Sequence, residues 1–187
     1  MIITISGRPG SGKSVVASRV AEALGIQHVS AGDFMREMAA ERGISILQLS
    51  RLAEADAEID AEIDGRTSRL AAAGESFVID ARLGWHFVPE SLKVFLDVRP
   101  DVAAARIYEA GRGTERENVD LETTRRAVEE RSGSETERYM EYYGLDYTDP
   151  GQYDLVIDTS DLTIDEVIDL ILARHRAGGG GSRAEMR

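Results

Sequence analysis

Residues 7–14 read Gly7-Arg8-Pro9-Gly10-Ser11-Gly12-Lys13-Ser14 and match the pattern G-x-x-x-x-G-K-[ST] without a gap. The preceding run, Ile2 to Ser6, is rich in β-branched residues and is typical of a buried strand. In the following segment, Val15 to Leu24, apolar residues recur at helical spacing until Gly25. Because a strand precedes the pattern and a helix follows it, we predict a phosphate-binding loop, or P-loop.

The chemistry of such a loop requires these residue types. Glycines permit a backbone with positive φ and bring N–H groups close to a phosphate, and the start of the next helix adds partial positive charge. We expect Lys13 to reach the β- and γ-phosphates of a nucleoside triphosphate and the Ser14 hydroxyl to ligate Mg²⁺. The alternative, a glycine-rich turn without a ligand, is disfavoured because the pattern and its context agree.

The composition narrows the class of protein. A chain of 187 residues is expected to form one domain with a sizeable core. Its net charge of −12 argues against nucleic acid as a partner, because phosphate backbones demand basic surfaces. The absence of cysteine excludes disulfides, a cysteine zinc site and a cysteine nucleophile, and suits the cytoplasm. We expect no membrane span and no signal peptide, because no long apolar run is present and the first strand begins at residue 2.

The rest of the chain alternates strands with helices. Further strands are expected at 27–30, 76–80, 92–98 and 153–157, and further helices at 31–43, 45–55, 57–73, 100–107, 121–143 and 164–173. This alternation predicts an α/β fold with a parallel sheet covered by helices on both faces. Ligands of such sheets bind beyond the carboxyl ends of the strands, where Ser6, Ser30, Asp80 and Asp158 fall.

Residues 30–74 are expected to form a helical insertion between two strands. Acidic residues occupy alternate positions of its last helix, and we interpret them as a solvated face rather than metal ligands: Glu58, Asp60, Glu62 and Asp64. Residues 108–120 are polar, contain glycine and predict a mobile loop. Residues 178–187 have the composition of a flexible tail.

Basic residues are gathered at a few places in this acidic chain. Arg36 lies one turn into the helix after Ser30, and Arg82 follows the strand that ends at Asp80. On the long helix, the positions of Arg131, Glu135 and Arg138 fall on one face. Two interpretations of this triplet stay open from its spacing: an exposed ladder of ion pairs, or cations that bind phosphate oxygens. A P-loop that holds a donor phosphate favours the second, because phosphoryl transfer depends on positioning and charge stabilisation.

Asp80, at the end of a hydrophobic strand, occupies the position of a Walker B aspartate. Such a residue holds Mg²⁺, and we expect it to do so through water. The alternative is an aspartate that caps a turn.

These segments together resemble the nucleoside monophosphate (NMP) kinases, and most closely the archaeal-type cytidylate kinases. The resemblance covers residues 1–173 and is carried by the P-loop and by residues 29–39, 80–85, 131–146 and 153–160. The run Arg138-Tyr139-Met140-Glu141-Tyr142-Tyr143-Gly144-Leu145-Asp146 is its most specific part, since the P-loop is shared with many NTPases.

The resemblance implies a P-loop NTPase fold, a three-layer α/β/α arrangement around a five-stranded parallel sheet. Residues 1–177 would form one kinase domain, with its core at 1–29, 75–108 and 151–177. Residues 30–74 would be the NMP-binding insertion. Residues 109–150 would form a lid and its helix, closing over ATP and excluding water.

The same resemblance assigns roles to individual residues. The ATP-binding set would be Gly7, Arg8, Pro9, Gly10, Ser11, Gly12, Lys13, Ser14, Val15 and Arg106. The set for the acceptor monophosphate would be Ser30, Asp33, Arg36, Arg82 and Glu135, with Glu135 near the ribose. Lys13, Arg131 and Arg138 would stabilise the transferring phosphates, and Ser14 and Asp80 would hold Mg²⁺.

Some positions depart from the family pattern. Ala81 replaces a common glycine, Val15 a threonine, and Ala110 a lid arginine for which Arg112 is a possible substitute. Leu83 stands where the classical bacterial cytidylate kinases place a base-reading aspartate, and Ala31 lacks the hydroxyl common in adenylate kinases. Cytosine specificity therefore follows from overall similarity rather than from a named base contact.

The function expected is Mg²⁺-dependent transfer of the ATP γ-phosphate to CMP or dCMP. Alternatives are the same fold acting on AMP, UMP or a small metabolite, or a nucleotide-binding switch. The switch is disfavoured because the chain lacks the guanine-reading motif N-K-x-D. The partners expected are small nucleotides, with no nucleic acid and no membrane. We expect a monomer, although the sequence does not define the oligomeric state.

Overall fold

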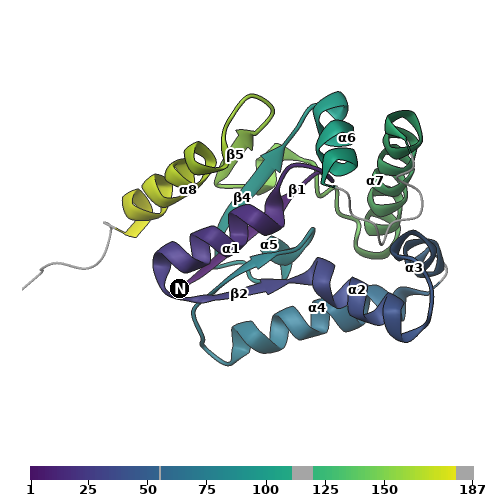
Figure 1. Ribbon diagram of the computed structural model, residues 1–187. Helices are drawn as coiled ribbons and strands as arrows, with labels where there is room; N and C mark the ends of the chain where they lie inside the picture. Colours follow the sequence, from purple (N-terminus) through teal and green to yellow (C-terminus); the bar gives the residue numbers. More distant parts are fainter. Residues whose placement is uncertain (55, 111–119, 180–187) are drawn as a thin grey trace, which may run out of the picture.

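The P-loop strand β1 (Ile2–Gly7) lies at the centre of a five-stranded sheet with the order β2-β3-β1-β4-β5 (Figure 1). The computed structural model describes residues 1–54, 56–110 and 120–179. All neighbouring strands are parallel, which confirms the predicted sheet. The other strands are β2 (Gln27–Ser30), β3 (Phe77–Asp80), β4 (Leu92–Asp97) and β5 (Leu155–Asp158).

The register brings the polar strand ends to one edge. Ser30 of β2 pairs with Asp80 of β3, and Ile5 of β1 pairs with the same Asp80. Gly7 pairs with Leu96 of β4. The P-loop, which follows β1, therefore begins beside Asp80, as the sequence predicts.

The helices agree with the predicted segments. They are α1 (Lys13–Leu24), α2 (Ala31–Glu41), α3 (Ile46–Ala53), α4 (Ala57–Ala72), α5 (Gly84–Phe87), α6 (Pro100–Glu109), α7 (Leu121–Tyr143), the 3-10 turn η1 (Pro150–Gln152) and α8 (Ile164–Gly179). The short elements α5 and η1 were not predicted. Helix α8 extends beyond the expected residue 173 and includes two glycines of the predicted tail.

Each face of the sheet has its own core. One face packs apolar side chains of β1 and β4 against α1 and α8, including Ile5, Val20 and Ile171. The other face carries Phe95, which packs with Trp85 of α5 and with aromatic residues at and beyond the end of α7. The sheet is therefore covered on both sides, as the three-layer prediction requires.

Helix boundaries follow local signals in the sequence. Pro100 lies in the first turn of α6, where its missing N–H has no cost. At the start of α8, the Thr163 N–H donates to Glu166 (2.8 Å) and the Glu166 N–H donates to the Thr163 hydroxyl (3.3 Å). This reciprocal pair is a capping box, which fixes the first residue of the helix.

From Glu130 onward, helix α7 is bonded to the insertion: to α3, which lies beside it in Figure 1, and to α4 through Arg138 and Tyr143. Arg51 pairs with Glu130 (2.5 Å), Glu54 accepts from Ser134 (2.5 Å), and the Tyr142 hydroxyl reaches the carbonyl of Ala53 (3.0 Å). These contacts join two segments that are about eighty residues apart in the chain.

Some expectations are not addressed by the fold. The predicted mobile loop lies mostly outside the described residues, and so do Arg112 and tail residues 180–187. The boundaries drawn for the insertion and the lid remain predictions. Within the described ranges, no helix is both long enough and apolar enough to cross a membrane.

Candidate active site

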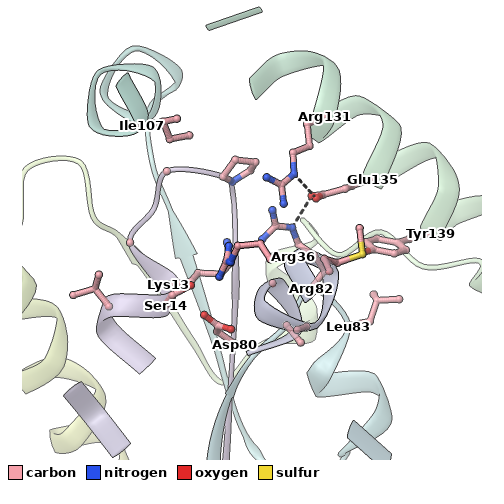
Figure 2. A pocket seen from close by; sticks show the side chains of 18 of the residues that line it. Lys13, Ser14, Arg36, Asp80, Arg82, Leu83, Ile107, Arg131, Glu135 and Tyr139 are labelled. Carbon is pink, nitrogen blue, oxygen red and sulfur yellow. Dashed lines mark hydrogen bonds and ion pairs between the residues drawn. The ribbon is translucent and has the colours of Figure 1, made fainter. Parts of the chain in front are cut away.

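A cavity of about 380 Å³ opens at the carboxyl ends of the strands. The P-loop borders it together with parts of α2, α4, α6 and α7 and the segment after β3 (Figure 2). It brings together most of the predicted site residues: Pro9, Gly10, Gly12, Lys13, Ser14, Val15, Arg36, Asp80, Arg82, Arg106, Arg131, Glu135 and Arg138.

Two glycines of the P-loop are required by close packing. Gly7 has φ 149°, and a Cβ at this position would lie 2.2 Å from the carbonyl oxygen of Leu96. Gly10 has φ 77°, and a Cβ there would lie 2.8 Å from the backbone of Ala103 in α6. Any side chain at either position would displace backbone, so the loop keeps this path only with glycine.

Lys13 begins α1 and extends into the cavity, where Figure 2 shows it above Asp80. Its Nζ donates to the carbonyl of Arg8 at 3.2 Å. Burial, and then the nearby Arg82 guanidinium, lower the pKa of Lys13 well below its usual value. The ammonium is therefore poorly stabilised until an anion enters the cavity.

Asp80 fits a divalent cation. Its carboxylate is buried, and both of its oxygens lack a hydrogen-bond donor in the described part of the chain. Nε2 of the His28 imidazole lies 3.9 Å from Oδ2. Such a carboxylate is costly unless a ligand or water satisfies it. Ser14 lines the same cavity, so a hydroxyl and a carboxylate are both available there to Mg²⁺.

Arg82 and Glu135 form a buried ion pair between the sheet and α7. Arg82 Nε donates to Glu135 at 2.7 Å and Nη1 donates to the carbonyl of Gly7 at 2.9 Å. Arg131 donates to the other Glu135 oxygen at 3.1 Å. Burial alone would raise the pKa of Glu135, but Arg82 and Arg131 lower it to about 2. These interactions fix both guanidinium groups at the cavity wall (Figure 2).

Arg138, on the same face of α7, is held by contacts with the insertion. Its side chain is 2% exposed, its Nε donates to Asp60 Oδ2 at 2.5 Å, and its Nη1 donates to the carbonyl of Ser50 at 3.1 Å. Because Glu135 and Arg138 are both buried, the interpretation of the triplet as an exposed ion-pair ladder is wrong.

The predicted solvated acidic face exists only in part. Glu58 and Glu62 are exposed, but Asp60 is 4% exposed and Asp64 lines the cavity, so the expectation was wrong for these two residues. The Tyr143 hydroxyl donates to Asp64 Oδ2 at 2.7 Å. Burial without a cation of its own raises the pKa of Asp64 to about 7.

This raised pKa predicts that Asp64→Asn stabilises the protein at pH 8. The folded-state pKa of Asp64 lies above its unfolded value near 3.8, so ionising Asp64 destabilises the fold progressively between about pH 4 and pH 7. Asparagine removes this cost and keeps an oxygen for Tyr143. We expect the variant to melt several degrees higher at pH 8, with a gain that vanishes near pH 4. Calorimetry at both pH values measures this, and an equal change at both would contradict it.

The remaining predicted residues have local partners. Arg36 Nε donates to Asp33 (3.1 Å) while its side chain, 40% exposed, lines the cavity. Arg106 Nη2 donates to the carbonyl of Thr159 at 2.7 Å. Ser30 caps α2 by accepting from the Asp33 N–H at 3.3 Å. The described cavity wall does not include Gly7, Arg8, Ser11, Ser30 or Asp33, whose predicted contacts with nucleotides remain predictions.

Sequence reasoning missed Asp60, Asp64 and Tyr139 as wall residues. The spacing of the acids offered a signal, because residues four apart share one face of a helix. The partners of Asp60 and Asp64, which are Arg138 and Tyr143 of α7, lie far away in the sequence, so local spacing does not predict that these two acids face inward.

Comparisons with known proteins agree with this geometry. A model of the cytidylate kinase-like family matches residues 2–161. The cytidylate kinase of Methanothermobacter thermautotrophicus is 46% identical over 160 residues, which are 86% of this chain and 96% of that protein. The cytidylate kinase of Methanopyrus kandleri is 40% identical over 183 residues, 92% of each chain. The solved shikimate kinase of Aquifex aeolicus has a TM-score of 0.59 and 18% identity, covering 97% of this chain and 100% of that chain, which supports the fold alone.

Proposed function

The chain belongs to the cytidylate kinase-like family, and we propose that its cavity holds a donor nucleotide at the P-loop and an acceptor nucleotide toward α2, α4 and α7. The enzyme is a nucleoside monophosphate kinase that transfers a phosphoryl group from ATP to CMP. The observation that carries the proposed site is one cavity that is lined both by Lys13 of the P-loop and by arginines from separate elements.

The donor end consists of the P-loop and Arg106. Backbone N–H groups of the loop and the start of α1 would bind the ATP phosphates, with Lys13 at the β- and γ-phosphates. Arg106 is anchored to the carbonyl of Thr159, which keeps its guanidinium at the cavity wall. Ser14 and Asp80 would hold Mg²⁺, which when bound neutralises charge on the phosphate oxygens.

The acceptor end contains Arg36 and Arg82. The acceptor phosphate is an ionised nucleophile already, so the reaction requires no general base. Arginine binds phosphate oxygens in pairs through its planar fork. Arg131 and Lys13 would stabilise the charge on the transferring group, and Glu135 keeps Arg82 and Arg131 in place. Arg138 would contribute to this charge stabilisation after leaving Asp60.

An acceptor panel tests this function. Release of ADP is measured in a coupled assay with ATP, Mg²⁺ and each of CMP, dCMP, UMP, AMP and GMP. We expect CMP and dCMP to give the highest kcat/KM. Absence of stimulation by CMP would contradict the proposal.

A cytoplasmic location, expected from the absence of cysteine, remains part of the proposal.

Replacing Arg36 with alanine is expected to weaken use of the acceptor more than binding of ATP. Arg36 lies on the acceptor side of the cavity and is bonded only to Asp33 among the described residues, so the fold tolerates its loss. Removing one arginine–phosphate contact corresponds to about 2–3 kcal/mol, or a 30- to 150-fold rise in the KM for CMP. Steady-state kinetics with both substrates measure this.

Arg42→Ala is the matched control, because Arg42 ends the same helix with an exposed side chain. It should leave both KM values unchanged. A fall in ATP affinity with an unchanged KM for CMP in Arg36→Ala would show that the donor and acceptor ends are wrongly assigned.

A further inference from the structure

Helix α4 contributes two carboxyl groups to the cavity wall. Asp60 and Asp64 lie one turn apart on α4, and both line the cavity. A carboxylate repels phosphate, so this wall faces a different part of a bound nucleotide. The phosphates belong with the cations Lys13, Arg36 and Arg82, which line the same cavity.

The two acids differ in their partners. Asp60 accepts from Arg138 on both oxygens, at 2.5 and 3.4 Å. Asp64 accepts from the Tyr143 hydroxyl on Oδ2, and no described residue donates a hydrogen bond to Oδ1. Asp64 therefore keeps acceptor capacity at the cavity wall. Burial raises the pKa of Asp64, which agrees with a carboxyl group that has a single hydrogen-bond donor among the described residues.

Apolar side chains line the same cavity. Met35 of α2, Leu83 and Tyr139 contribute to its wall. Figure 2 shows Leu83 and Tyr139 on the side of Arg82 that is away from Lys13 and Ser14. A nucleotide whose phosphate contacts Arg36 and Arg82 can therefore place its planar base against apolar walls. The edge of that base then meets the acids of α4.

We propose that Asp64, supported by Asp60, determines acceptor specificity by accepting a hydrogen bond from the exocyclic amino group of the base. Cytosine presents an N4 amino donor at this edge, whereas uracil presents the O4 acceptor at the same position. The free acceptor oxygen of Asp64 therefore attracts CMP and repels UMP. Adenine also carries an amino group, so this wall separates amino bases from keto bases and leaves cavity shape to exclude AMP. The inference rests on the proposed function.

Asp64→Asn tests the proposal. If the amide oxygen keeps the bond from Tyr143, the amide NH₂ occupies the position of Oδ1 and presents a donor where the wild type presents an acceptor. We expect the ratio of kcat/KM for CMP to that for UMP to fall at least tenfold, with an absolute gain for UMP. We also expect the wild type, but not the variant, to bind CMP much more tightly than its 4-deamino analogue in calorimetric titrations.

The matched control is Glu58→Gln, which changes an exposed acid on the same helix. It should leave the CMP-to-UMP ratio unaltered, and thermal melting shows whether each variant is folded. An unchanged ratio in a folded Asp64→Asn that still phosphorylates CMP would overturn the assignment of Asp64. Failure of the wild type to use CMP would instead overturn the proposed function.

Discussion

Lys13→Met is expected to lower kcat about a thousandfold without unfolding the protein. Loss of one preorganised donor at a developing charge costs about 10²–10³ in kcat, and we expect the upper end because Lys13 would contact the β- and γ-phosphates, between which the bond breaks. The ammonium is held in the cavity by one carbonyl at 3.2 Å, and burial lowers its pKa. Replacing it with an apolar side chain of similar length removes a desolvation cost, so the variant should melt at the wild-type temperature or above it.

Lys93→Met provides the control, because Lys93 is the other lysine of the chain and lies on β4 outside the cavity wall. Its kcat should match the wild type. Single-turnover kinetics with saturating ATP and CMP separate the chemical step from binding. A Lys13→Met enzyme with wild-type kcat and a raised KM for ATP would show that Lys13 only binds the donor.

Glu135→Gln is expected to cause the largest loss of stability among the site variants. It leaves Arg82 and Arg131 next to a neutral side chain at a position that is 5% exposed. Breaking a buried ion pair in this way costs about 3–5 kcal/mol. For a chain of this length, that corresponds to a fall in Tm of roughly 6–20 °C.

The loss of stability in Glu135→Gln should depend on pH. The pKa of Glu135 is lowered from 4.5 to about 2 on folding, so its stabilising charge is fully present above about pH 4.5 and is lost as the pH falls through 2. The difference in Tm between wild type and variant should therefore be largest at neutral pH and shrink toward pH 2. Glu137→Gln, an exposed change on the same helix, should shift Tm by little at any pH.

Added inorganic phosphate tests whether Arg82 and Arg131 bind anions. Anions that bind Arg82 and Arg131 restore the missing negative charge, so inorganic phosphate should raise the Tm of Glu135→Gln more than that of the wild type. An equal rise in both proteins would indicate that these arginines do not face the bound anion.

The sheet and the P-loop could be predicted because their signals are local. The spacing of Gly7, Gly12 and Lys13 is specific to one backbone path, and β-branched runs mark the strands. Helix α5 was missed because four residues carry no measurable period.

The acidic wall shows the limit of local patterns. Asp60, Asp64 and Thr67 form one stripe of α4, and Asp60 and Thr67 on this stripe are buried. Acidic residues at alternate positions were interpreted as one face. Glu58 and Glu62 in fact fall on the side of the helix opposite to this stripe. Asp60 can be buried because it pairs with Arg138, which is 78 residues away in the chain. A local stretch of sequence therefore cannot contain both partners.

The bonds from α7 to α3 and α4 have a consequence for how the protein opens. Glu130, Ser134, Arg138 and Tyr142 attach successive turns of α7 to the insertion. Elements joined in this way unfold locally as one cooperative unit. The most protected amide hydrogens of all three helices should therefore report a common free energy of opening, and CMP should slow exchange throughout α7, including turns distant from the nucleotide.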